Sequence, residues 1–128
     1  TIIITDIDRA GATSPAAQLL RDAGAHVAGF TRLGGDLPMD DILRWISSEH
    51  DIGDILIDAG GGVLGRLFAQ DLVNEARVFI APQLLGDDLA RPCLRDMTSP
   101  ALTDGVHMHL QRTQRRGDDM IATYRVHA

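Results

Sequence analysis

Residues 55–68 read ILIDAGGGVLGRLF, and they pass from an apolar run through three glycines into a pattern typical of a helix. The run at 55–57 is continuously apolar, as in a strand that is buried on both faces. From Val63 onward, apolar residues recur at the spacing of one helical face. The stretch therefore predicts a strand, a glycine turn and a helix in succession, an arrangement found at the carboxyl ends of strands in open α/β sheets.

The same alternation of strands and helices extends on both sides of this stretch. Further strand patterns occur at residues 1–5, 25–30, 76–81, 106–110 and 120–126. Helical patterns run from Pro15, with Ser14 as N-cap, and from 39 to about 50, while 115–119 reads as a turn. We therefore predict an α/β fold with three layers, in which a mainly parallel sheet with flanking helices ends in a C-terminal antiparallel hairpin.

The composition bounds the class of protein. A chain of 128 residues suits one domain, and 45% apolar with 23% charged residues predicts that it folds. A net charge of -6 gives no basic field for nucleic acid or an anionic lipid surface, and no apolar run has the length of a membrane span. We expect neither nucleic acid nor membrane as a partner. The single cysteine, Cys93, fits a reducing cytoplasmic setting and is expected to be a small buried apolar residue.

The chain begins inside a strand pattern and without an initiator methionine. A wholly apolar strand is usually buried between neighbouring strands. We therefore expect missing sequence upstream of Thr1, so that residues 1–128 form a single but partial domain.

The glycine turn at 60–62 has two interpretations. Glycines let a ligand approach main-chain N–H groups, and the N-terminus of the following helix adds roughly half a positive charge, which suits a phosphate or diphosphate. Alternatively, the glycines serve only a tight turn and close packing of the helix. Asp58 likewise either accepts hydrogen bonds from a sugar hydroxyl or caps the turn. The pattern is neither G-x-G-x-x-G nor a P-loop with its lysine.

A longer stretch carries a resemblance that favours the ligand interpretation. Residues 58–86 read DAGGGVLGRLFAQDLVNEARVFIAPQLLG. They resemble the reductase domain of the bifunctional riboflavin-biosynthesis deaminase/reductase family, where an acidic residue and a glycine turn precede a helix, L-V-D-E, a strand and A-P-K-L-L-G. The segment ARPCL at 90–94 is similar to the next segment of that family. The resemblance implies a dihydrofolate reductase-like fold.

The same resemblance implies an activity and a set of site residues. The activity is NADPH-dependent reduction of the ribosylamino group of a phosphorylated aminopyrimidine to a ribitylamino group. The substrate-contacting acid of the family falls on Asp58. The cofactor-binding turn falls on Gly60, Gly61, Gly62, Val63, Leu64, Gly65 and Arg66. A cytoplasmic homodimer is also implied, and no catalytic side chain need stand out because hydride chemistry belongs to the nicotinamide.

The chain departs from the family pattern in ways that keep a second hypothesis open. Family members mostly carry Glu at Asp58 and Pro-Thr at Gly61-Gly62, so this chain has a shorter acid and lacks a hydroxyl at the turn. Nothing here corresponds to the upstream part of the reductase domain or to the zinc ligands of the deaminase half. The alternative is a nonenzymatic nucleotide-binding or assembly module that keeps the glycine turn; a flavodoxin-like regulatory domain would lack the terminal hairpin.

Three further side chains are candidate ligand contacts. Arg32 follows the strand at 25–30 and lies either near the 2′-phosphate of NADPH or on the surface. His107 and His109 are two apart on a predicted strand and would point to the same side. Since no third ligand is visible in the sequence, we expect an exposed strand face and no metal site.

Overall fold

A computed structural model describes residues 1–97 and 101–126. The chain forms two compact units, Thr1–Ile55 and Leu56–Ala128. Each unit combines helices with a small sheet, so the α/β class is confirmed. Within the described ranges, no helix is both long enough and apolar enough to cross a lipid bilayer.

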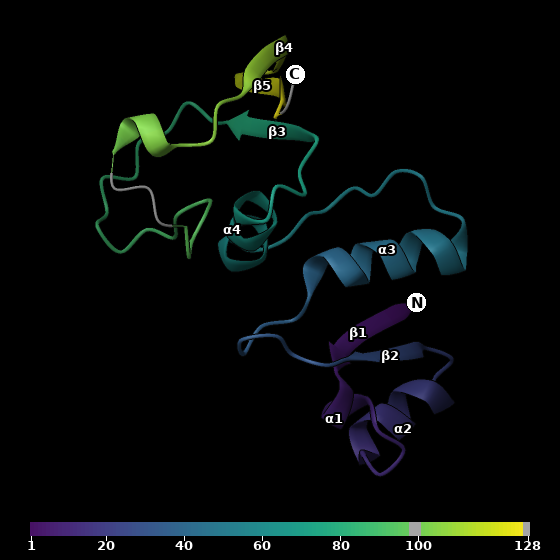
Figure 1. Cartoon of the computed structure of the whole chain (residues 1–128). Coiled ribbons are helices and arrows are strands. Elements are labelled where there is room, and N and C mark those ends of the chain that lie inside the picture. Colours follow the sequence, from purple (N-terminus) through teal and green to yellow (C-terminus); the bar gives the residue numbers. More distant parts are fainter. Residues whose placement is uncertain (98–100, 127–128) are drawn as a thin grey trace. The chain divides into compact units, whose positions relative to one another are not determined.

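The N-terminal unit is built on two parallel strands that are connected through helices. Its elements are β1 (Ile2–Asp6), α1 (Ile7–Ala10), α2 (Pro15–Asp22), β2 (His26–Phe30) and α3 (Met39–His50). β1 pairs with β2 in parallel from Ile2↔His26 to Asp6↔Phe30. Figure 1 shows α1 and α2 on one face of the two strands and α3 on the other.

Alternate side chains of β2 face these two helical layers, as the two-residue period of a strand requires. On one face, Val27 is buried with Ala10 and Ala17. Gly29 lies on the same face, where a Cβ would be 2.7 Å from the Cβ of Ala10, so only glycine lets α1 approach the strand. The core on this face of the strands therefore consists mainly of small residues, with Ile3 packed against them.

On the other face, β2 contacts α3 through aromatic rings. The ring centroids of His26 and Phe30 lie 5.6 and 5.7 Å from that of Trp45, both in edge-on geometry. The ring of His50 completes the cluster, 5.4 Å from Trp45. Trp45 therefore covers the flank of the helix.

The predicted start of α2 at Pro15 is confirmed, and both ends of the helix have capping groups. The Ser14 hydroxyl oxygen accepts a hydrogen bond from the Ala17 N–H at 3.4 Å. At the other end, Gly24 has φ +84, and the N–H groups of Gly24 and Ala25 donate to carbonyls of the last turn. These paired bonds satisfy the free carbonyls at the helix end, and the left-handed position favours glycine.

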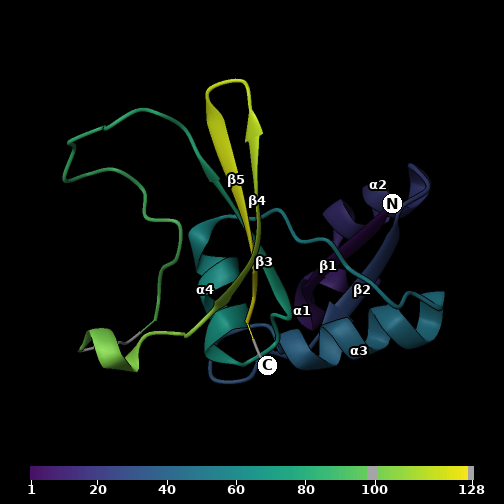
Figure 2. The same cartoon turned by 90° about the horizontal axis from the view of Figure 1, so that it is seen from above.

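The C-terminal unit is built on one helix and an antiparallel sheet. Its elements are α4 (Gly61–Ala69), β3 (Glu75–Ile80), the 3₁₀ turn η1 (Leu102–Asp104), β4 (His109–Arg116) and β5 (Asp119–Arg125). The strand order is β3-β5-β4, with every pair antiparallel. Figure 2 shows β4 and β5 as a long twisted hairpin next to β3, which confirms the predicted terminal hairpin.

The strand predicted at 55–57 is wrong. Residues 54–60 form no helix or strand, and Leu56 is 87% exposed rather than buried. A short apolar run becomes a strand only where neighbours supply its hydrogen bonds, and neither β1–β2 nor β3–β5–β4 includes it. The prediction of a mainly parallel sheet is therefore also wrong for the described residues, where parallel pairing is seen between β1 and β2 alone and the three-stranded sheet is antiparallel.

Candidate functional site

The glycine turn forms the start of α4 and leaves main-chain donors available. Gly60 is the N-cap, and its carbonyl accepts from the N–H groups of Val63 and Leu64 at 3.0 and 3.2 Å. No side chain caps the helix. Within residues 1–97 and 101–126, no acceptor is found for the N–H of Gly61 or of Gly62. These two donors at the positive end of the helix dipole are the groups that would hold an anion.

Asp58 lies two residues before this helix start, in the irregular segment that leads into it. Its side chain is exposed, and no hydrogen bond joins it to any part of the chain that the structure describes. The capping interpretation of Asp58 is therefore wrong in this structure. The carboxylate is available to accept hydrogen bonds from a ligand hydroxyl.

The remaining residues predicted for the turn differ in how accessible they are. Val63 is 39% exposed, whereas Leu64 and Arg66 are half-buried. Gly65 is buried. Gly60 faces open space, because a Cβ built there would meet nothing within 4 Å. The most accessible residues of the predicted site are therefore Gly60 and Val63.

Gly61 and Gly65 are covered by a later loop segment, Pro92–Met97, which we call the strap. The Arg95 N–H donates to the Gly61 carbonyl at 2.9 Å. A Cβ at Gly61 would lie 2.8 Å from the carbonyl oxygen of Pro92, and one at Gly65 would overlap the carbonyl oxygen of Arg95. Close packing thus explains these two glycines.

The sequence carries only a partial signal for this contact. Gly61 and Gly65 are one turn apart on the same side of α4, a spacing that permits close backbone approach. Nothing in the apolar pattern of the strap identifies it as the partner.

The side chains of the strap border an apolar cavity of about 310 Å³. It is lined by Leu94 and Met97 of the strap and by Phe68, Gly105, Val106 and Met108.

Cys93 corrects a prediction. Its side chain is exposed rather than buried. The contact that residue 93 makes with α4 is through its backbone, since its carbonyl oxygen would lie 3.1 Å from a Cβ at Gly61. The side chain is consequently directed away from that packing.

Arg32 is engaged within the N-terminal unit. Its guanidinium donates to the Asp6 carboxylate at 2.5 Å and to the Gly35 carbonyl at 2.6 Å. The Asp8 backbone N–H also donates to the Asp6 carboxylate, and this bond, followed by those from Arg32, lowers the pKa of Asp6. Arg32 therefore ties the ends of β1 and β2 together.

His107 and His109 are both exposed. In the part of the chain that the structure describes, no group of three or more histidine, cysteine or acidic side chains is arranged to hold a metal ion. The chemistry that the start of α4 offers is anion binding by the N–H groups of Gly61 and Gly62, near the exposed carboxylate of Asp58.

Comparison with known families and proteins identifies similar sequences. A family described as the RibD C-terminal domain matches residues 9–122. The riboflavin biosynthesis protein RibD of Haemophilus influenzae is 32% identical over 91 residues, which cover 68% of this chain and 24% of that protein. The 2,5-diamino-6-ribosylamino-4(3H)-pyrimidinone 5′-phosphate reductase of Methanothermobacter thermautotrophicus is 27% identical over 112 residues, covering 86% of this chain and 49% of that protein. The chain thus spans half or less of the length of these relatives.

Solved structures show the same fold. Two forms of Acinetobacter baumannii RibD superpose on this chain with TM-scores of 0.76 and 0.77 at 20% and 19% identity. They cover 97% and 99% of this chain, which in turn corresponds to 36% and 37% of theirs. At these identities the likeness concerns the fold alone.

Proposed function

The chain belongs to the RibD C-terminal domain family, and from this premise we propose that it is an NADPH-dependent reductase of riboflavin biosynthesis. The reaction would convert the ribosylamino group of a phosphorylated aminopyrimidine into a ribitylamino group. The observation that carries the proposal is the family match over residues 9–122, which includes Asp58 and the whole glycine turn. A relative named as a reductase of such a pyrimidinone phosphate aligns over most of this chain.

The start of α4 fits the diphosphate of a nicotinamide coenzyme. The N–H groups of Gly61 and Gly62 have no acceptor among the described residues, and the space beside Gly60 is open. These glycines would hold the diphosphate, while Val63, Leu64, Gly65 and Arg66 form the first helical turns whose dipole supports it. The bound coenzyme supplies the hydride.

Asp58 is the candidate contact for the substrate. A free carboxylate next to the coenzyme turn can accept hydrogen bonds from a sugar hydroxyl and so orient the group to be reduced. Holding the substrate in one orientation lowers the entropy cost of reaching the transition state. No side chain is assigned to proton transfer.

The proposal extends to the organisation of the protein. Residues 1–128 would form a single reductase domain in the three-layer dihydrofolate reductase-like arrangement. The resemblance of residues 58–86 to the riboflavin-pathway family supports this arrangement. A cytoplasmic homodimer completes the proposal.

The test separates binding from turnover. Purified protein is titrated with NADPH by fluorescence and then incubated with the phosphorylated ribosylaminopyrimidine. We expect saturable binding, oxidation of NADPH, and a product heavier by two hydrogen atoms. Binding without turnover would favour the nonenzymatic nucleotide-binding module, and absence of both would refute the proposal.

A matched pair of variants tests the place of the coenzyme. Gly62→Thr adds a hydroxyl at the turn and Gly62→Val adds a side chain of the same shape without it. A Cβ at this position would meet only the Asp96 carboxylate oxygen, at 3.5 Å, so both side chains have room at their base. If the diphosphate binds here, Thr should bind NADPH about threefold to tenfold more tightly than Val, the value of one hydrogen bond. Equal affinities would place the coenzyme elsewhere.

A further inference from the structure

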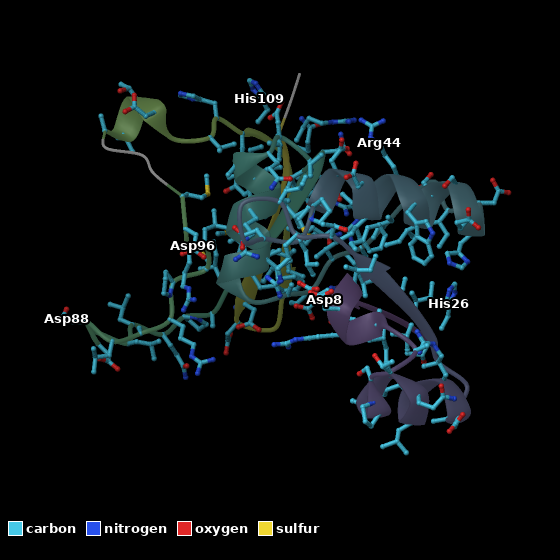
Figure 3. The ribbon with its side chains drawn as sticks, turned by 60° about the horizontal axis from the view of Figure 1, so that its bottom comes forward. Asp8, His26, Arg44, Asp88, Asp96 and His109 are labelled. Atoms are coloured by element: carbon cyan, nitrogen blue, oxygen red, sulfur yellow. The ribbon has the colours of Figure 1, made fainter. Side chains whose placement is uncertain are left out.

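The carboxylate of Asp96, a residue of the strap, lies close to the glycine turn. The Asp96 Oδ2 atom lies 3.5 Å from the position that a Cβ of Gly62 would occupy. Figure 3 shows Asp96 close to α4. The Gly62 N–H, on the same residue, is one of the two donors without an acceptor in the described ranges. A negative charge and unused anion donors are thus neighbours.

The backbone around Asp96 is placed by the contact of the strap with α4. Before it, the Arg95 N–H is bonded to Gly61 at 2.9 Å. After it, Met97 lines the apolar cavity with Phe68 of α4. Asp96 itself has φ +61, a left-handed conformation that is uncommon outside glycine, asparagine and aspartate. The bond between Arg95 and Gly61 therefore places residue 96, whose side chain is exposed, beside the start of α4.

A carboxylate at this place has opposite effects on α4 and on a ligand. It stabilises the positive end of the helix dipole. It also repels a phosphate group that approaches the same N–H groups, because two negative charges a few ångströms apart oppose each other even in a largely aqueous environment. The affinity of the turn for anions should therefore depend on the charge of Asp96.

We propose that Asp96 lowers the affinity of the coenzyme site for anions, because its carboxylate weakens the binding of phosphate groups to the N–H groups of the glycine turn. The coenzyme as ligand rests on the proposed function, whereas the charge effect applies to any phosphate group at this place. The strap acts as the element that positions the carboxylate. Removal of the charge strengthens binding.

The test is Asp96→Asn, with Asp88→Asn as the matched control. Asparagine tolerates the left-handed backbone of residue 96, so the strap keeps its conformation. Asp88 is an exposed carboxylate on the same connection, and Figure 3 shows it at the outer end of the loop, away from α4. Both variants change the net charge equally.

Affinity for NADPH is measured by fluorescence at low and high salt. We expect D96N to bind about threefold to tenfold more tightly than the unmodified chain at low salt, with a smaller difference at high salt, and D88N to be unchanged. Equal or weaker binding by D96N overturns the inference. An equal gain in D88N also overturns it, because the effect would then come from net charge.

Inorganic pyrophosphate provides a probe that does not depend on the proposed function. Its binding is followed by NMR at the N–H groups of Gly61 and Gly62, in the same three proteins. If no protein binds NADPH but D96N binds pyrophosphate more tightly than D88N, the coenzyme assignment fails and the role of Asp96 stands. If NADPH binds while D96N gains nothing with either ligand, the role of Asp96 alone fails.

Discussion

Replacement of Gly65 by alanine tests whether the strap is seated on α4 through close backbone contact. In an exposed helix, alanine would stabilise the protein by about 1 kcal/mol relative to glycine. Here the added Cβ would overlap the Arg95 carbonyl oxygen and lie 2.9 Å from the Arg95 carbonyl carbon, so backbone must move. Overpacking of this kind costs about 1–3 kcal/mol, and loss of the Arg95–Gly61 hydrogen bond adds about 1 kcal/mol. G65A should therefore be less stable by roughly 1–3 kcal/mol.

The matched variant is Gly62→Ala, three positions earlier on the same helix. Its Cβ would meet only the Asp96 carboxylate, at an ordinary contact distance of 3.5 Å. We expect G62A to be neutral or more stable by up to about 1 kcal/mol. Urea unfolding followed by circular dichroism measures both free energies of unfolding. A G65A protein that is as stable as G62A would refute the strap packing.

Three other substitutions are expected to have separate effects. Asp58→Asn should raise the KM for the pyrimidine substrate about tenfold while leaving NADPH affinity unchanged, since it weakens a charge-assisted hydrogen bond; steady-state kinetics with an unchanged KM would remove Asp58 from the site. The pKa of Asp6 is lowered in the folded protein, so its contacts with Asp8 and Arg32 stabilise the fold above the ordinary pKa of 3.8, and this stabilisation is lost as pH falls through the pKa of the folded state. Asp6→Asn should therefore reduce the difference between the unfolding free energies measured at about pH 7 and pH 3. An unaltered difference would contradict this. Ser14→Ala should destabilise the N-terminal unit by about 0.5–1 kcal/mol in thermal unfolding, since the hydroxyl caps α2, and a stability gain would contradict the cap.

Local signals in the sequence identify most helices and strands. Ser14-Pro15 and Gly24 mark the two ends of α2, because capping chemistry depends on residues adjacent in sequence. The alternating pattern at the C-terminus identifies the β4–β5 hairpin, whose turn contains Gly117 at φ +61. The family match confirms the resemblance seen in residues 58–86.

Features that depend on distant partners are less predictable. The helix α1 has only four residues, too few for a periodic pattern, and begins where the Asp6 carboxylate accepts from the Asp8 N–H. The run at 55–57 has a strand composition but no partner strand among the residues that the structure describes. Cys93 is exposed because the strap packs by its backbone, a contact that side-chain hydrophobicity does not report.

The glycines of the turn allow two competing interpretations in the sequence, and the structure supports the packing interpretation for two of them. Gly61 and Gly65 are needed for close packing of the strap, while Gly60 faces open space and Gly62 has both room and an unused N–H among the described residues. The chain also differs here from the pattern that it resembles, since a proline at Gly61 would bring a Cβ within 2.8 Å of the Pro92 carbonyl oxygen. Glycine instead of proline at this position therefore allows the strap to pack closely against α4. The same contact brings the Asp96 carboxylate to a turn that lacks the family's threonine hydroxyl. If the proposed coenzyme binds here, main-chain N–H groups are its donors at the turn, and the nearby negative charge opposes it.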